Sequence, residues 1–258
     1  MTQEERLKEI RNWLEKEHEL TTRQLADHFN VSFDTARRDV LRLTNTGQAI
    51  RIHGGLMDID RNGVPDFLSR NQIQSPIKEK MAQLAKHFVH PGQLDFIGTS
   101  TSLRQLCSLI TGMNLEVITN SIDNALALMT NPLPSVNLLG GEIKKKERLI
   151  YSSSALAEIN KIHFNTVFIG TSRVRTDGVY TSTLQDAELI SNVVSRASQV
   201  VLIAEKYKFT NKSSSPFMSC SLDKIDVVIT DTFLPPEFQQ LFNPNTQIIS
   251  VTRRKNHD

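Results

Sequence analysis

The segment from residue 20 to residue 55 constrains the fold of this chain more than any other feature. It contains two stretches with the apolar spacing of short helices, 22–29 and 33–45, which are separated by a tight turn. Residues 3–17 precede them with apolar side chains at helical intervals, and a basic strand-like segment, 49–55, follows. Three helices and a short strand in this order predict a winged helix-turn-helix domain.

Residues that favour helix ends stand where this interpretation needs them. Thr21 or Thr22 is a suitable N-cap for the second helix, and Ser32 is a suitable N-cap for the third. Gly47 follows the third helix, where a left-handed C-cap residue is common. We therefore place the first domain at residues 1–57.

In a helix-turn-helix domain, the second helix of the motif lies in the major groove of duplex DNA. Side chains near its N-terminus reach base edges, and longer basic side chains reach phosphates. We expect Asp34, Thr35 and Arg37 near bases, and Arg38 and Arg42 on phosphates. The candidate DNA-contacting residues of the whole domain are Thr22, Ser32, Asp34, Thr35, Arg37, Arg38, Arg42, Arg51, His53, Gly54 and Gly55.

The predicted wing contributes the last four of these residues. Arg51 and His53 supply positive or hydrogen-bond-donating groups, and Gly54-Gly55 would permit a close approach of the backbone to DNA. Charge is distributed in agreement with this picture. Residues 1–29 carry five Lys/Arg and seven Asp/Glu, a net charge of −2, whereas residues 30–57 carry four and two, a net charge of +2. The alternative is that these arginines form an ordinary solvated helix face.

The residues VSFDTARRDVLRL, followed by IRIHGG, closely resemble the N-terminal signature of the DeoR family of bacterial transcription regulators. The positions that carry the resemblance are Val31, Ser32, Thr35, Arg37, Arg38, Asp39, Gly47, Arg51, His53, Gly54 and Gly55. Ala36 and Val40 stand where the family more often has an Ile or Val and a Leu. The resemblance implies a regulator that binds double-stranded operator DNA.

Residues 58–75 are polar and contain Asn62-Gly63 and Pro65, so they predict a linker, with a short helix around 66–71. From residue 76 to residue 258, apolar strand-like segments alternate with helical ones. This repeated pattern predicts an α/β domain with a mostly parallel sheet and helices on both faces.

Most strands of this predicted sheet end in Gly, Ser, Thr or Asn. Because ligands of such sheets bind at the carboxyl ends of the strands, these loops are candidate ligand contacts. They are Gly98, Thr99, Ser100, Thr101, Ser102, Thr119, Asn120, Gly140, Gly141, Glu142, Arg173 and Lys208. Free backbone N–H groups, hydroxyls and a helix N-terminus favour an anion, and the many hydroxyl partners favour a phosphorylated sugar. The alternative is that the Ser and Thr side chains only cap helices.

DeoR-family sensor domains look like ribose-5-phosphate isomerase and glucosamine-6-phosphate deaminase folds. This chain matches their Thr-Asn, Gly-Gly-Glu and late Lys positions. It departs in the first loop, where Gly98 and Ser100 replace an Asp and a Gly, and where Thr101 and Ser102 form the Thr pair. Gly98, together with Thr181-Ser182-Thr183-Leu184, is similar to the lactose phosphotransferase-system branch of the family, whose effector is a tagatose phosphate.

These features predict a regulator that has no catalytic site, metal or cofactor. Its expected effector is a phosphorylated sugar, and its expected oligomeric state is a dimer or tetramer. One alternative is a sugar-phosphate isomerase that uses Asp186, Glu188, Lys208 or Asp231. Another is a regulator whose sensor domain no longer binds a ligand. With no 18-residue apolar run and no signal-peptide pattern, we expect a cytoplasmic protein that does not enter a membrane. Cys107 and Cys220 lack metal-ligand spacing and are expected to serve packing.

Overall fold

The computed structural model describes residues 1–45, 49–58, 75–145, 147–211 and 215–252. The chain divides into two compact units, Met1–Gln74 and Ser75–Asp258. The predicted linker lies almost entirely outside the described residues, as do its short helix and the C-cap glycine predicted at Gly47. No helix within the described ranges is both long enough and apolar enough to cross a membrane.

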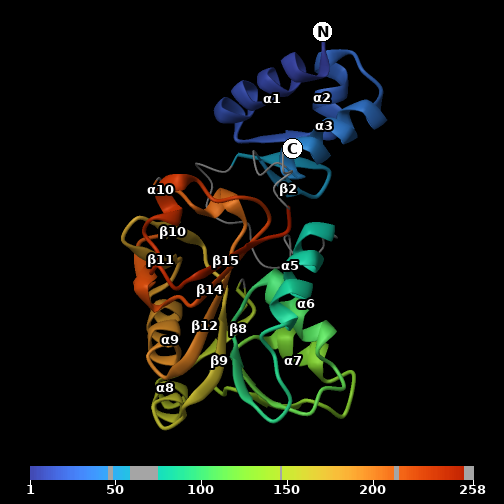
Figure 1. Cartoon of the computed structure of the whole chain (residues 1–258). Coiled ribbons are helices and arrows are strands. Elements are labelled where there is room, and N and C mark those ends of the chain that lie inside the picture. Colours follow the sequence, from blue (N-terminus) through green and yellow to red (C-terminus); the bar gives the residue numbers. More distant parts are fainter. Residues whose placement is uncertain (46–48, 59–74, 146, 212–214, 253–258) are drawn as a thin grey trace, which may run out of the picture. The chain divides into compact units, whose positions relative to one another are not determined.

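The described residues of the first unit form three helices and three short strands (Figure 1). They are α1 (Gln3–Glu17), β1 (Glu19–Thr21), α2 (Thr22–Phe29), α3 (Phe33–Asn45), β2 (Ile50–Ile52) and β3 (Gly55–Met57). Capping boxes begin the first two helices. The Thr2 side chain accepts from the N–H of Glu5, and Thr21 accepts from the N–H of Gln24, while each partner side chain reaches back to the cap backbone.

The wing is the hairpin β2–β3, and β3 also pairs with β1, so the strand order is β1-β3-β2. The sequence predicted a single wing strand and missed β1 and β3, because three-residue strands leave almost no alternation to detect. A core of apolar side chains from all three helices and from this sheet holds the unit together. Its most deeply buried members are Ile10, Leu14, Leu20, Leu25, Ala36, Leu43 and Leu56.

The second unit is built on a seven-stranded sheet with the order β15-β14-β12-β9-β4-β5-β6, in which every neighbouring pair is parallel. Its strands are β4 (Leu94–Ile97), β5 (Glu116–Thr119), β6 (Ser135–Leu138), β9 (Phe164–Ile169), β12 (Ala197–Ile203), β14 (Val227–Thr230) and β15 (Gln247–Ser250). Its helices are α5 (Pro76–Lys86), α6 (Thr101–Leu109), α7 (Ile122–Leu128), α8 (Ser153–Ile159), α9 (Leu184–Val194) and α10 (Pro236–Gln239).

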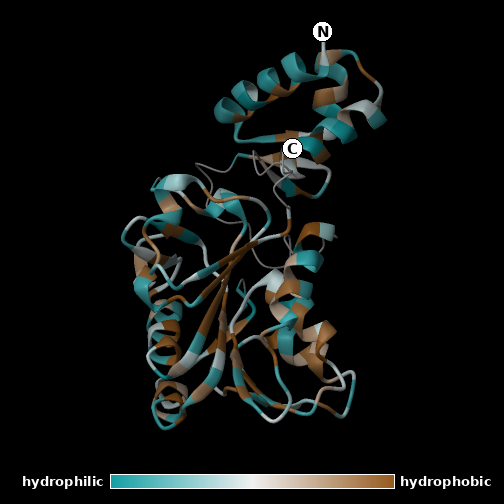
Figure 2. Cartoon of the chain, in the orientation of Figure 1, coloured by the Kyte–Doolittle hydropathy of each residue, from teal (hydrophilic) through white to brown (hydrophobic). Residues whose placement is uncertain are grey.

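Helices cover both faces of this sheet, with α5, α6 and α7 on one face and α8 and α9 on the other (Figure 1). Successive strand residues point to opposite faces. In β12, Val200 and Leu202 join the core against α8 and α9, whereas Val201 and Ile203 join the core against α5 and α6. The strands are accordingly the most hydrophobic part of the unit (Figure 2). The predicted mostly parallel α/β fold is confirmed.

Two smaller antiparallel sheets were not predicted. One is the hairpin β7 (Glu142–Lys144) with β8 (Leu149–Tyr151). The other has the order β10-β11-β13 and consists of β10 (Arg173–Arg175), β11 (Gly178–Thr181) and β13 (Phe217–Cys220). Two single-turn 3-10 helices, Lys206–Lys208 and Leu222–Lys224, complete the described elements. Cys107 and Cys220 are both free and buried, in agreement with a packing role.

Asp95 is a buried carboxyl group inside strand β4, which the sequence presents as an apolar strand. Its side chain is fully buried, and Oδ1 accepts a hydrogen bond of 3.1 Å from the backbone N–H of Thr166 on β9. Burial raises the pKa of Asp95 from 3.8 to about 7, against a smaller opposing effect of that hydrogen bond. The folded state therefore holds a proton on Asp95 at pH values where the unfolded chain has released it.

We predict that the second unit loses stability as the pH rises from about 4 to about 7, and that Asp95→Asn reduces this loss. Because the pKa of Asp95 is higher in the folded state than in the unfolded state, proton binding by Asp95 stabilises the folded state at low pH. This stabilisation disappears as the pH rises through the pKa of the folded state. At about 1.4 kcal/mol per pKa unit, the effect is on the order of 2–4 kcal/mol. Urea unfolding followed by circular dichroism at pH 5 and pH 8 measures it. An equal pH dependence in both proteins would contradict the assignment.

Candidate DNA-binding surface and ligand site

The third helix has one face in the core and one face in solvent. Ala36, Val40 and Leu43 are buried, whereas Asp34, Arg37 and Arg38 are exposed. This is the division that a recognition helix needs, because the exposed side chains are those that can enter the groove.

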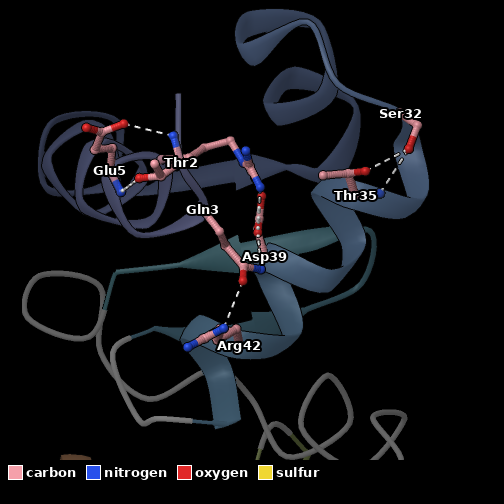
Figure 3. A network of polar contacts seen from close by, with 8 residues as sticks. Thr2, Gln3, Glu5, Ser32, Thr35, Asp39 and Arg42 are labelled. Atoms are coloured by element: carbon pink, nitrogen blue, oxygen red, sulfur yellow. Dashed lines mark hydrogen bonds and ion pairs between the residues drawn. The ribbon is translucent and has the colours of Figure 1, made fainter.

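The hydroxyls of Ser32 and Thr35 already have a role within the unit. Ser32 Oγ accepts a hydrogen bond of 3.2 Å from the N–H of Thr35 and lies 2.9 Å from the Thr35 hydroxyl. Ser32 therefore caps the helix, as predicted, and both side chains lie at its N-terminus (Figure 3).

Asp39 has a structural role that the sequence did not reveal. It follows the two exposed arginines, yet its side chain is fully buried and bonded to Arg6 of α1, with a second contact of 3.2 Å. Gln3 donates a hydrogen bond of 2.9 Å to Asp39 and accepts one of 2.8 Å from Arg42 (Figure 3). Arg6 is itself buried, and its bond to Asp39 raises the pKa of the guanidinium. This network fixes α3 against α1, and it also engages Arg42, a predicted phosphate contact.

The wing residues divide into exposed and buried positions. His53 and Gly54 are exposed at the hairpin turn, Arg51 is half-buried, and Gly54 has a positive φ of 80°. The reason for a glycine at position 55 differs from the predicted one. A Cβ on Gly55 would lie 2.1 Å from the carbonyl oxygen of Leu20, so glycine is required for the pairing of β3 with β1.

Thr22 is a correction to the predicted contact set. Its side chain is buried, and its backbone N–H donates a hydrogen bond of 2.7 Å to the carbonyl oxygen of Gly54. Thr22 therefore ties the start of α2 to the wing, and its side chain is not exposed to a groove. The sequence offered Thr21 or Thr22 as the N-cap of the second helix, and the structure assigns the cap to Thr21 and turns Thr22 inward.

In the second unit, the sheet has a topological switch point between the neighbouring strands β4 and β9. Strands β4, β5 and β6 are added on one side, and β9, β12, β14 and β15 on the other. Ligands of open parallel sheets bind at the carboxyl ends of the two strands where the order reverses. The loops that begin at Gly98 and Gly170 occupy these two ends.

Close packing connects the switch-point loops. The N–H of Gly98 donates to the carbonyl oxygen of Phe168 at 2.9 Å. A Cβ on Gly170 would lie 2.7 Å from the Cβ of Ser100, so only glycine allows the two loops to approach this closely. The Thr99 hydroxyl donates to the side chain of Asn120 at 3.3 Å, which joins the predicted Thr-Asn loop to the first loop.

Lys208 places a buried cation beside the loop that follows β9. Lys208 is buried, and its Nζ donates a hydrogen bond of 2.7 Å to the carbonyl oxygen of Thr171. Arg173 is also buried and donates to the carbonyl oxygen of Ser172 at 2.9 Å. Arg173 Cζ and Lys208 Nζ lie 5.9 Å and 6.0 Å from the centre of the Tyr207 ring, so these two buried cations, which follow β9 and β12 in the chain, lie around the same ring.

Several loop hydroxyls cap helices, which the sequence had left as the alternative role. Ser100, Ser121, Ser152 and Thr183 each accept a hydrogen bond from a backbone N–H in the first turn of a helix. Thr119 is fully buried, and its hydroxyl donates to the carbonyl oxygen of Ile97. These groups shape the loops, and Ser100 in particular has a capping role besides any contact with a ligand.

The predicted Gly-Gly-Glu loop makes its described contacts with the β7–β8 hairpin. A Cβ on Gly141 would lie 2.4 Å from the carbonyl oxygen of Tyr151, and the carbonyl oxygen of Gly140 accepts from the Ser152 hydroxyl. Glu142 is exposed and pairs with Lys144 at 2.8 Å. Thr101 and Ser102, by contrast, are buried in the first turn of α6, directly after Ser100.

Two of the carboxyl groups that an isomerase could use are hydrogen-bonded within the unit. Glu188 accepts a hydrogen bond of 2.7 Å from the Tyr151 hydroxyl, and Asp231 accepts one of 2.6 Å from the N–H of Lys206. Asp186 is half-buried in the first turn of α9, where burial and the nearby Glu147 raise its pKa to about 6. Burial also raises the pKa of Asp231.

A helix-turn-helix unit with an exposed basic helix, joined to a parallel α/β unit, defines a DNA-binding transcription regulator with a separate sensor. Residues 6–62 match the family model of the DeoR-like helix-turn-helix domain, and residues 73–232 match that of the DeoR C terminal sensor domain. The chain belongs to the DeoR family.

Curated relatives are similar over nearly their whole length. The HTH-type transcriptional repressor GlcR of Bacillus subtilis is 29% identical over 255 residues, which cover 98% of each chain. The lactose phosphotransferase system repressor of Streptococcus mutans is 28% identical over 254 residues, which cover 97% of this chain and 100% of that one. Ribose 5 phosphate isomerase A from Neisseria gonorrhoeae aligns with a TM-score of 0.38 and 17% identity over 54% of this chain and 55% of its own. This last likeness bears on neither activity nor ligand.

We predict that Asp39→Asn lowers the free energy of unfolding of the first unit by about 3 kcal/mol, because it leaves the buried Arg6 guanidinium without its countercharge. Trp13, the only tryptophan, lies in α1 and reports on this unit by fluorescence. Asp34→Asn, at an exposed position on the same helix, is the matched control and should leave unfolding unchanged. A similar small effect in both variants would show that the Arg6 pair does not hold α3.

Proposed function

We propose that this protein is a transcriptional repressor of a carbohydrate-utilisation operon, released from or recruited to its operator by a phosphorylated sugar. The observation that carries the sensor half of the proposal is a pair of buried cations, Arg173 and Lys208, in the segments that follow the neighbouring strands β9 and β12, with Lys208 bonded to the loop after β9. The similarity to GlcR and to the lactose phosphotransferase system repressor supports the repressor half. The proposed location is the cytoplasm, where operator DNA is accessible.

The proposed coupling is a thermodynamic linkage between two sites. A sugar phosphate that binds the DNA-competent and DNA-free states with different affinity shifts the balance between them, and by reciprocity DNA changes the affinity for the sugar. We further propose a dimer or tetramer, because two helix-turn-helix units on two half-sites bind DNA more strongly than one. A tagatose phosphate is the first candidate effector, owing to Gly98 and to residues 181–184.

The proposed DNA surface consists of exposed polar residues of α3, of half-buried Arg51 on β2 and of the exposed wing turn. These residues are Asp34, Arg37, Arg38, Arg42, Arg51, His53 and Gly54. Ser32 and Thr35 contribute at the helix N-terminus. In this arrangement Arg38 contacts a phosphate, so its effect on binding is electrostatic and independent of the base sequence.

We predict that Arg38→Ala weakens binding to specific and unrelated duplexes alike and reduces the slope of log affinity against log salt by about one unit. Arg11→Ala removes an arginine that is also exposed, from α1 and outside the proposed surface, and should leave the slope unchanged. The test is fluorescence anisotropy with labelled duplexes at salt concentrations from about 50 to about 200 mM. Equal slopes for wild type and Arg38→Ala would remove Arg38 from the interface.

The sensor is tested by gel-shift binding to DNA from upstream of the gene, with a panel of hexose and pentose phosphates that includes tagatose phosphates. We predict that one compound changes the affinity of the wild-type protein for DNA. Lys208→Met should bind DNA as the wild type does but respond to that compound at least tenfold less, since the buried cation is lost while the chain length is kept. Lys206→Met, an exposed neighbour, is the control.

The outcomes separate the competing functions. A response that Lys208→Met retains would place the anion site elsewhere. Tight DNA binding that no compound alters, together with no thermal stabilisation by any of them, would favour a regulator with a degenerate sensor. Conversion of a sugar phosphate into its isomer would favour an enzyme.

A further inference from the structure

Phe33 is a large apolar side chain that the first unit leaves in solvent. It is 56% exposed, whereas the core of the same unit buries its leucines and isoleucines almost completely. Among the described residues of this unit, the only other exposed side chain of this size and character is Met1, at the chain terminus. Burying a phenylalanine stabilises a fold by about 1.5–3 kcal/mol, so this ring does not serve the stability of the unit to which it belongs.

The position of Phe33 is more informative than its exposure. It is the first residue of α3 and follows the capping residue Ser32. Arg37 stands one turn further along the same ridge of the helix and is also exposed. An aromatic residue and an arginine therefore share one exposed face at the end of the helix whose N-terminal residues reach base edges in this class of domain.

The major groove offers a specific partner for an apolar ring. Of the groups that the four base pairs present there, the C5 methyl of thymine is apolar, whereas the others are hydrogen-bond donors or acceptors. Phosphates carry charge, so they are partners for the arginines and not for Phe33. The chemistry of the ring thus distinguishes base contact from backbone contact.

We propose that Phe33 is a specificity-determining residue, whose ring packs against the C5 methyl group of a thymine in the major groove. This inference rests on the proposed placement of α3 in the groove and adds a base preference to it. Arg37 and Arg38 supply the positive charge that holds the helix on DNA, and Phe33 supplies discrimination. A protein with this residue prefers thymine over cytosine or uracil at the position that the ring contacts.

The test compares thymine with uracil, which lacks only the methyl group. The probe is the strongest-binding duplex that the full-length protein selects from a random pool, with each thymine replaced in turn by deoxyuridine. For wild type, at least one replacement should weaken binding about threefold to tenfold. For Phe33→Ala, the same replacement should have no effect, because the partner of the methyl group is gone. Phe33→Leu, which keeps an apolar side chain, should show an intermediate penalty.

A matched control and two contrary outcomes make the test decisive. Leu126→Ala removes a side chain that is 54% exposed on α7 of the second unit, and it should keep the wild-type response to uracil. If uracil weakens binding equally in wild type and Phe33→Ala, the proposal is overturned. A weaker binding of Arg38→Ala would in that case still support the placement of α3 on DNA. An altered sedimentation of Phe33→Ala with unchanged DNA affinity would overturn it too, because the ring would then serve a protein interface.

Discussion

The parallel arrangement of the central sheet determines where the second unit can carry a site. Seven parallel strands bring all their carboxyl ends to one edge of the sheet. At that edge, the connections that follow β4 and β9 lead in opposite directions, which is where open parallel sheets bind ligands. Gly170 lets the two loops at this point approach within contact of Ser100. Lys208, which lies 37 residues from Thr171 in the sequence, reaches the same place because β9 and β12 are neighbours in the sheet. The position of Lys208 at this edge is thus a consequence of strand order, which no local sequence pattern expresses.

The first unit depends in a similar way on one buried ion pair. Burying Arg6 and Asp39 costs desolvation free energy, which their mutual attraction and the bond from Gln3 offset. An apolar pair would hold two helices equally well, but it would not fix Arg42 through Gln3. The three consecutive residues Arg37, Arg38 and Asp39 therefore divide their roles. The first two face solvent, and the third turns inward, because a helix rotates by about 100° per residue.

The sequence predicted the long elements of the fold correctly, and it failed where tertiary context decides. Helix Gln3–Glu17, helix Phe33–Asn45 and the alternation of strands and helices in a mostly parallel sheet followed from periodicity and caps. Strands of three residues, such as Glu19–Thr21, are too short to show alternation. The burial of Thr22 and of Asp95 depends on neighbours distant in the chain. The loop hydroxyls posed the same problem, since Ser100 caps a helix at a position where a ligand contact was also expected. The pairing of Lys208 with Thr171 was likewise beyond local reasoning.

The close approach of Gly55 to Leu20 has a consequence for the genetics of this regulator. Any other residue at position 55 pushes β3 away from β1, and with it the turn that presents His53 and Gly54. Alleles that abolish regulation should accordingly include substitutions at Gly55 as well as at the exposed arginines of α3. The two groups would look alike in a reporter strain. They would differ in the amount of protein that accumulates, because only the substitutions at Gly55 expose a misfolded unit to proteolysis.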